Sequence, residues 1–188
     1  MKIVALCGSP RDYGNSTAVL KHFLHAASKK ITQSWLIHLE QLRYKGCTGC
    51  YACKRDYQRC VLNDGLTAVL AAVELCDVLL IASPLYFGDL PGQLKLYLDR
   101  TFSFLVPGFS NKENPSRLAP GKKVIMVLLQ GHPSPSVYTN VFNRYNRFFE
   151  QQGFRENVLI RGYGMEKLNS LEKNEKLVQE LDEVAASL

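Results

Sequence analysis

The chain has 188 residues, which are enough for one ordinary domain with a sizeable core and too few for two. Hydrophobic residues make up 46% of it and charged residues 21%, which excludes the disordered, collagenous and disulfide-scaffold classes of protein. The formal charge of +6 would suit an anionic partner, but the basic residues are scattered and form no basic helical stripe, so no nucleic-acid partner is expected.

Short β-branched runs alternate with longer amphipathic segments, which predicts an α/β fold with a doubly wound five-stranded parallel sheet and helices on both faces. We expect strands at residues 2–7, 33–39, 77–82, 122–129 and 154–161. We expect helices at residues 16–29, 65–75, 92–105, 136–152 and 166–186. A single domain would span residues 1–188, with a cysteine-rich loop at 43–63 and an inserted surface loop at 107–121.

The apolar runs of this chain are short. The longest, at residues 78–82 and 124–129, have five and six residues, whereas a membrane span needs roughly 18. The apolar stretch of the first strand also ends too soon for the apolar core of a signal peptide. We therefore expect no membrane insertion and a cytoplasmic location.

The loop after the first strand combines glycines, hydroxyl groups and one arginine directly before a helix. Ligands of such folds bind beyond the carboxyl ends of the strands, and helix N-termini bind anions through free N–H groups, so this loop predicts a phosphate site. The residues expected to donate to the phosphate are Ser9, Arg11, Asn15, Ser16 and Thr17. Because the lysine of a nucleotide triphosphate loop is missing, a phosphate monoester is favoured. The alternative is a serine-capped helix after a glycine turn.

The loops after the third and fourth strands contain a second set of candidate residues. The loop after the third strand contains Pro84, Leu85, Tyr86, Phe87 and Gly88. Its aromatic pair can stack on a planar ring, while its proline and glycine shape a backbone that approaches the ring closely. The alternative is a hydrophobic turn that buries both aromatic side chains in the core. After the fourth strand, Gln130 and Gly131 form a glycine-containing turn, beside which His132 is interpreted as an inert surface residue.

These motifs occur in a specific order along the chain. They comprise Gly8-Ser9-Pro10-Arg11 with Gly14-Asn15-Ser16, Ser83-Pro84-Leu85-Tyr86-Phe87-Gly88, Pro91, Gln93-Leu94-Lys95 and Asp99-Arg100. The combination resembles the flavodoxin-like NAD(P)H-dependent FMN reductase superfamily. The resemblance implies FMN, with its phosphate in the first loop and its isoalloxazine ring against residues 84–88, with Gln130 and Gly131 contributing from the neighbouring loop. It also implies a homo-oligomer, either a dimer or a dimer of dimers.

Four of the six cysteines lie in one loop, as Cys47-x2-Cys50-x2-Cys53-x6-Cys60. This spacing is similar to the compact cysteine motif of the iron-sulfur flavoproteins. Cysteines spaced in this way can ligate a 4Fe-4S cluster, and five basic residues against two acidic ones between residues 40 and 60 would offset its negative charge. Structural zinc and free or redox-active thiols remain open as alternatives. Cys7 and Cys76 are predicted to be buried packing residues.

The sequence therefore predicts a flavoprotein oxidoreductase that passes electrons between a 4Fe-4S cluster and FMN. NAD(P)H is a candidate electron donor, and the expected partner is a small redox protein such as ferredoxin or a small-molecule acceptor. One alternative is an NAD(P)H-dependent FMN or quinone reductase without a cluster. A second alternative is a non-catalytic electron carrier of flavodoxin type. No residue stands out as a proton donor, so no catalytic residue is assigned.

Overall fold

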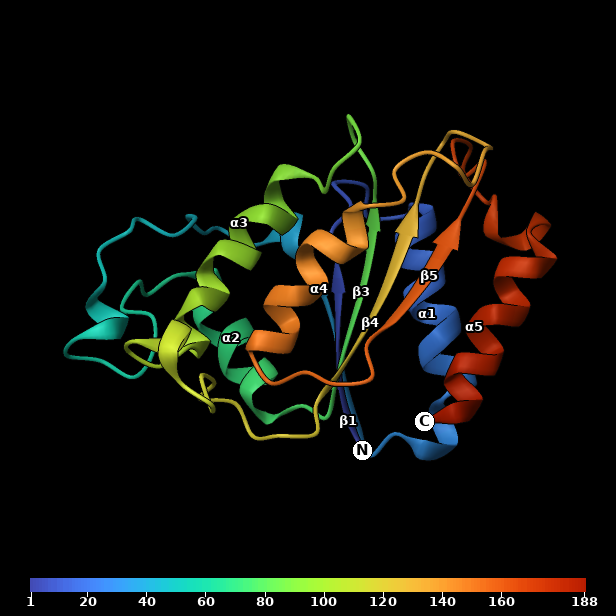
Figure 1. Ribbon diagram of the computed structural model, residues 1–188. Coiled ribbons are helices and arrows are strands. Elements are labelled where there is room, and N and C mark those ends of the chain that lie inside the picture. Colours follow the sequence, from blue (N-terminus) through green and yellow to red (C-terminus); the bar gives the residue numbers. More distant parts are fainter.

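The computed structural model describes residues 1–188 and contains one five-stranded parallel sheet (Figure 1). The strands are β1 (Lys2–Cys7), β2 (Gln33–His38), β3 (Val78–Pro84), β4 (Lys123–Leu129) and β5 (Val158–Gly162). They lie in the order β2-β1-β3-β4-β5, and every neighbouring pair is parallel. This is the strand order of the flavodoxin-like fold, so the predicted fold class is confirmed.

Five α-helices cover the two faces of the sheet (Figure 1). One face carries α1 (Asn15–Ala26) and α5 (Glu175–Ser187), and the other carries α2 (Gly65–Leu75), α3 (Gly92–Arg100) and α4 (Val141–Gln151). Successive side chains of a strand point to opposite faces, so each strand supplies both cores. In β1, Ile3, Ala5 and Cys7 join the core under α1 and α5, whereas Val4 and Leu6 join the other core. Burial on both faces explains why the central strands are continuously apolar.

Helix α4 begins at Val141, five residues later than expected, because the preceding segment is held as a loop. The side-chain amide of Gln130 donates to the carbonyl oxygens of His132 and Ser134, both at 2.8 Å. Arg161 of β5 donates to the carbonyls of Pro135 and Val137 in the same segment, at 2.9 and 2.5 Å. These bonds satisfy the backbone without a helix.

Helix α5 begins at Glu175 instead of residue 166, and β5 begins at Val158 instead of residue 154. The side chain of Asn174 caps α5 by accepting a hydrogen bond from the N–H of Leu177 at 3.1 Å. The side chain of Asn157 accepts from the N–H of Val124 at 2.9 Å, so a side chain replaces a backbone partner at the start of β5. Both boundaries are therefore decided by asparagine side chains.

The segment 107–121 has two parts. Residues 107–114 are mostly exposed, in agreement with a surface loop, but Leu118 is buried in the core. The hydroxyl of Ser116 donates to the carbonyl of Gln152 at 2.6 Å, at the end of α4. The second part of the segment therefore packs against the body of the protein. No helix of the chain is both long enough and apolar enough to span a bilayer.

Gly8, directly after β1, is packed tightly between α3 and β3. A Cβ atom at Gly8 would lie 2.9 Å from both Leu94 Cδ2 and Ser83 Oγ, which is too close for ordinary contact. We expect Gly8→Ala to lower the free energy of unfolding by about 1–3 kcal/mol, as overpacked core substitutions do. Gly92→Ala is the control, because a Cβ there meets nothing within 4 Å and should leave stability unchanged or raise it. Urea unfolding of both variants checks this, and equal midpoints for Gly8→Ala and wild type would contradict it.

Candidate functional site

A cavity of about 260 Å³ lies at the carboxyl ends of β1, β3 and β4, and we call it the strand-end cavity. The residues that line it are Ser9, Arg11, Gly14, Asn15, Ser16, Pro84, Leu85, Tyr86, Leu129, Gly131, Met165 and Glu166. The structure thus brings most of the predicted cofactor-binding residues to one place. Four of them, Thr17, Phe87, Gly88 and Gln130, do not line this cavity.

The N-terminus of α1 opens into the strand-end cavity without a cap. Its N-cap residue is Gly14, no side chain caps it, and its first turn holds no acidic residue. The alternative of a serine-capped helix is therefore wrong. The backbone N–H groups of Asn15, Ser16 and Thr17 have no partner within the protein. Free N–H groups together with the positive end of the helix dipole make this turn suitable for an anion.

The side chain of Asn15 has a structural role that the sequence did not reveal. Its amide nitrogen donates to the carbonyls of Met165 and Lys167, at 3.1 and 2.7 Å, and its oxygen accepts from the N–H of Ser170 at 3.1 Å. The predicted side-chain donor is thus fully occupied, and only its backbone N–H stays free. Thr17 is buried as well, with its hydroxyl 3.6 Å from the sulfur of Cys7.

The loop after β3 is a tight hairpin that projects past the strand ends (Figure 1). Tyr86 and Asp89 exchange two backbone hydrogen bonds of 2.9 and 3.0 Å. Phe87 and Gly88 between them both have left-handed backbones, with φ of 50° and 77°, which is typical of a type I′ turn. Phe87 is fully exposed and Tyr86 is 43% exposed, so the alternative in which this turn buries its aromatics is wrong. Asp89 accepts from Tyr145 of α4 at 2.9 Å, which ties the hairpin to that helix.

The loop after β4 lines the cavity with Gly131, while the side chain of its other candidate residue, Gln130, bonds to protein groups outside the cavity. Gly131 lines the cavity, whereas the side chain of Gln130 is buried and accepts from Arg161 at 2.6 Å. Met165 and Glu166, which follow β5, were not predicted as lining residues. No local motif marks them, because long-range hydrogen bonds bring that segment to the cavity: Asn15 donates to its carbonyls, and the N–H of Met165 donates to the carbonyl of Gln130 at 2.9 Å.

The four clustered cysteines surround a second cavity of about 550 Å³, between their own loop, the end of α3 and α4. We call it the cysteine cavity. Cys47 and Cys50 are exposed, Cys60 is half-buried, Cys53 is buried, and none forms a disulfide. No three histidine, cysteine or acidic side chains are close enough to hold one metal ion. All four cysteines therefore line one cavity, but their side chains are not close enough together to bind a single metal ion.

The two remaining cysteines lie inside the protein. Cys7 and Cys76 have no exposed surface, so their prediction as buried packing residues is confirmed. Burial raises the pKa of Cys76 to about 11, which keeps this thiol protonated.

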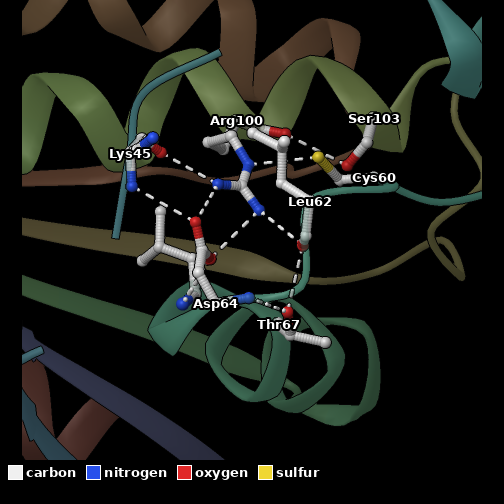
Figure 2. A network of polar contacts seen from close by, with 8 residues as sticks. Lys45, Cys60, Leu62, Asp64, Thr67, Arg100 and Ser103 are labelled. Carbon is white, nitrogen blue, oxygen red and sulfur yellow. Dashed lines mark hydrogen bonds and ion pairs between the residues drawn. The ribbon is translucent and has the colours of Figure 1, made fainter. Parts of the chain in front are cut away.

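A buried arginine connects the cysteine loop to α3 (Figure 2). The guanidinium of Arg100 donates to Cys60 Sγ at 3.1 Å and to the Asp64 carboxylate at 2.8 Å. Burial alone would raise the pKa of Asp64, but the hydrogen bonds from Arg100 and from the N–H groups of Lys45 and Leu66 outweigh it and hold that pKa below its ordinary value. Asp64 is therefore a charged partner for Arg100 at neutral pH.

Three more basic side chains donate to backbone carbonyls, two of them within the cysteine loop and one in the segment after α3. Arg117, from the segment 107–121, donates to the carbonyl of Cys53 at 2.9 Å, and Arg55 donates to that of Cys50 at 3.0 Å. Lys54 donates to the carbonyls of Phe102 and Leu105, at 2.5 and 2.6 Å. The contacts of Arg100 and Arg117 with the cysteine loop were not predicted, because both residues lie far along the chain from the basic residues between positions 40 and 60.

The exposed thiol of Cys50 accepts hydrogen bonds within its own loop. A hydrogen bond from the N–H of Ala52, and then one with the hydroxyl of Thr48, lowers the pKa of Cys50.

The cysteine cavity and the strand-end cavity have no lining residue in common. Tyr145 connects them, since it lines the cysteine cavity and donates to Asp89 of the hairpin.

Comparison with known proteins places this geometry in a family. The family model described as NADPH-dependent FMN reductase matches residues 1–140. An iron-sulfur flavoprotein of Methanocaldococcus jannaschii is 32% identical over 101 residues, which are 54% of this chain and 52% of that protein. The chain spans about half the length of the curated relatives it matches.

Solved structures agree with the fold. An FMN-dependent NADH-azoreductase from Bacillus anthracis, in complex with FMN, superposes with a TM-score of 0.74 at 17% identity, covering 100% of this chain and 99% of that one. An NAD(P)H:quinone oxidoreductase from Methanothermobacter marburgensis superposes with a TM-score of 0.71 at 17% identity, covering 98% and 95%. At such identities the likeness shows the shared fold.

The hydrogen bonds of Asn15 predict a test of the cavity wall. Asn15→Ala removes three of them, so we expect the free energy of unfolding to fall by about 1–3 kcal/mol and the amide of Ser170 to exchange faster with solvent. Ser170→Ala is the control, because it removes only an exposed bond to the carbonyl of Lys167. Urea unfolding and amide hydrogen exchange check both effects, and unchanged exchange at Ser170 in Asn15→Ala would exclude this role.

The lowered pKa of Asp64 predicts a loss of stability on the acid side. A carboxyl group whose pKa is lower in the folded chain stabilises the fold above its ordinary pKa of 3.8, and this contribution disappears as the pH falls through the folded value. Wild type should therefore lose more free energy of unfolding between about pH 6 and pH 3 than Asp64→Asn does. Asp56→Asn, at an exposed position of the same loop, should follow the wild-type profile. Parallel profiles for wild type and Asp64→Asn would refute the prediction.

Proposed function

Because the chain belongs to the NADPH-dependent FMN reductase family, we propose that it is an FMN-dependent oxidoreductase whose flavin binds in the strand-end cavity. One observation carries this proposal. The uncapped N-terminus of α1 and the aromatic hairpin after β3 line the same cavity, so an anion site and a planar surface lie side by side. A flavin mononucleotide has a phosphate and a planar ring, which match these two features.

The phosphate would bind at the start of α1. Ser9, Arg11 and Ser16 line the cavity there, and the free N–H groups of residues 15–17 add backbone donors. Thr17 would take part through its N–H, because its hydroxyl lies beside Cys7. Asn15 would likewise take part through its N–H, while its side chain holds the segment 165–170 in place.

The ring would lie against the hairpin after β3. Pro84, Leu85 and Tyr86 line the cavity on that side, and Gly131 lines it on the other. Phe87 and Gly88 would border the ring from the hairpin tip, and Gln130 would act by shaping the loop that carries Gly131. FMN, when bound, exchanges two electrons with a hydride donor and single electrons with a one-electron carrier. The protein binds and orients it, and NAD(P)H is the donor we propose.

We further propose that Cys47, Cys50, Cys53 and Cys60 hold a 4Fe-4S cluster. Four reduced thiols around one cavity, with Arg100, Arg117 and Lys54 beside them, are the donor set and the charge that such a cluster requires. Relatives that match about half of this chain are named iron-sulfur flavoproteins, which supports the proposal. Structural zinc usually uses two separated pairs of cysteines, whereas cysteines spaced two residues apart in one loop are typical of the loop that encloses a four-iron cluster. The cluster would supply one-electron transfer.

A second candidate function is NAD(P)H-dependent reduction of FMN or a quinone without a cluster. It is favoured by a relative from Pectobacterium atrosepticum that is named FMN-dependent NADH:quinone oxidoreductase and is 32% identical over 115 residues. In both cases the acceptor would approach the rim of the strand-end cavity, where Tyr13 and Phe87 are exposed. We propose a small-molecule acceptor or a small redox protein there, and a homo-oligomer as the assembly.

The phosphate assignment predicts the effect of two substitutions. We expect Arg11→Ala and Ser16→Ala each to weaken FMN binding about 10-fold or more, since each removes a hydrogen bond to a charged group. Arg147→Ala, on an exposed position of α4, is the control for the loss of a positive charge. Titration of flavin-free protein with FMN measures the affinities. If both cavity variants bind FMN as tightly as wild type does, the phosphate lies elsewhere.

The cluster assignment predicts the metal content of protein purified without oxygen. Iron and sulfide should each amount to about four per chain, with a broad visible absorbance beneath the flavin bands. Cys60→Ser should lower both contents and leave the flavin in place. A metal-free anaerobic preparation that still oxidises NAD(P)H would decide in favour of the reductase without a cluster.

A further inference from the structure

We propose that Arg100 is the positioning residue of the cysteine loop, and that it fixes Cys60 as the first ligand before any metal binds. This inference rests on the proposed cluster, and it names a residue outside the cysteine motif that decides how the motif is arranged. Arg100 is the last residue of α3 and lies 40 residues further along the chain than Cys60.

All five N–H groups of the Arg100 guanidinium have acceptors, and all of these acceptors lie at the two ends of the cysteine loop (Figure 2). Nε donates to Cys60 Sγ at 3.1 Å. Nη1 donates to the carbonyl of Lys45 and to Asp64 Oδ2, both at 2.8 Å. Nη2 donates to the carbonyl of Leu62 at 3.1 Å and to Asp64 Oδ1 at 3.3 Å. One side chain therefore joins the start of the loop to its end.

Asp64 makes this junction rigid because it also begins α2. Its carboxylate accepts from the N–H of Leu66 at 3.0 Å, and its own N–H donates to Thr67 Oγ1 at 3.0 Å, which together form a capping box. The N–H of Lys45 adds a further bond to Asp64 Oδ2 at 3.2 Å. The loop is thus closed between two helices, α2 and α3.

Separating the buried charge of Arg100 from Asp64 would cost a large amount of free energy. The side chain of Arg100 has no exposed surface and that of Asp64 is 18% exposed, so breaking their pair would leave a buried, unpaired charge. By contrast, Cys47 and Cys50 are exposed, and the hydrogen bonds that Cys50 accepts come from Ala52 and Thr48 of its own loop. Cys60 is therefore held by α3, whereas no hydrogen bond joins the sulfur of Cys47 or Cys50 to that helix.

The Nε–Sγ bond also has a consequence for the electron chemistry. Hydrogen bonds to ligand sulfurs and nearby charges set the reduction potentials of iron-sulfur clusters. A donor with a positive charge on Cys60 stabilises the reduced, more negative cluster and raises its potential. Asp64, on the far side of the same guanidinium, has the opposite effect because its charge is negative.

The experiment compares Arg100→Gln, Asp64→Asn and the control Arg147→Gln with wild type. Metal-free protein is first treated with trypsin, which can cut the loop after the exposed Arg59. Arg100→Gln and Asp64→Asn should be cut roughly tenfold faster than wild type, as expected from the loss of charged hydrogen bonds, and Arg147→Gln should not. The anaerobic proteins are then titrated to measure the cluster potential. We expect Arg100→Gln to shift it to more negative values and Asp64→Asn to more positive ones.

Shifts of the cluster potential in opposite directions would indicate positioning and charge tuning. A simple loss of structure would shift the potential of both variants in the same direction. Equal cutting rates for Arg100→Gln and wild type, or equal shifts for the two variants, would overturn the inference. If Arg100→Gln does not fold, Asp64→Asn decides alone: faster cutting with a more positive potential supports the inference, and wild-type behaviour in both overturns it. If wild type takes up no iron, the proposed cluster fails, while the cutting rates still test the role of Arg100 in closing the loop.

Discussion

The parallel direction of all five strands is the constraint on which the rest of this structure depends. It brings every loop that follows a strand to the same edge of the sheet, and it requires both faces to be covered. The loops after β1 and β3 meet at this edge because those strands are neighbours, and they form the strand-end cavity. The loop after β2 also leaves this edge, but none of the residues of the cysteine loop lines the strand-end cavity.

The cysteine loop has little regular structure, and its backbone needs other partners. Basic side chains supply many of them: Arg100 binds the carbonyls of Lys45 and Leu62, Arg117 binds that of Cys53, and Arg55 binds that of Cys50. The same side chains place positive charge next to the thiols. One set of residues therefore shapes the loop and provides the electrostatic surroundings in which thiolates are stable.

The walls of the strand-end cavity depend on polar side chains that bind backbone rather than ligand. Asn15 holds the segment after β5, and Gln130 together with Arg161 holds the segment after β4. These side chains leave backbone and small residues facing the cavity. Such an arrangement keeps the loops in place before a ligand binds, which lowers the ordering cost of binding.

The sequence by itself determined the elements whose signal is local. The apolar runs of β3 and β4 predicted buried parallel strands because a strand covered on both faces has no polar positions, and the glycine-containing loop after β1 predicted that a helix begins directly after it. Only the tertiary structure decided the starts of α4 and α5, the occupation of the Asn15 side chain and the part of Arg100 in the cysteine loop. The physical reason is distance along the chain: Asn15 bonds to Lys167 across 152 residues and Arg100 to Cys60 across 40, and no local pattern encodes which partner a polar side chain will meet once the chain has folded.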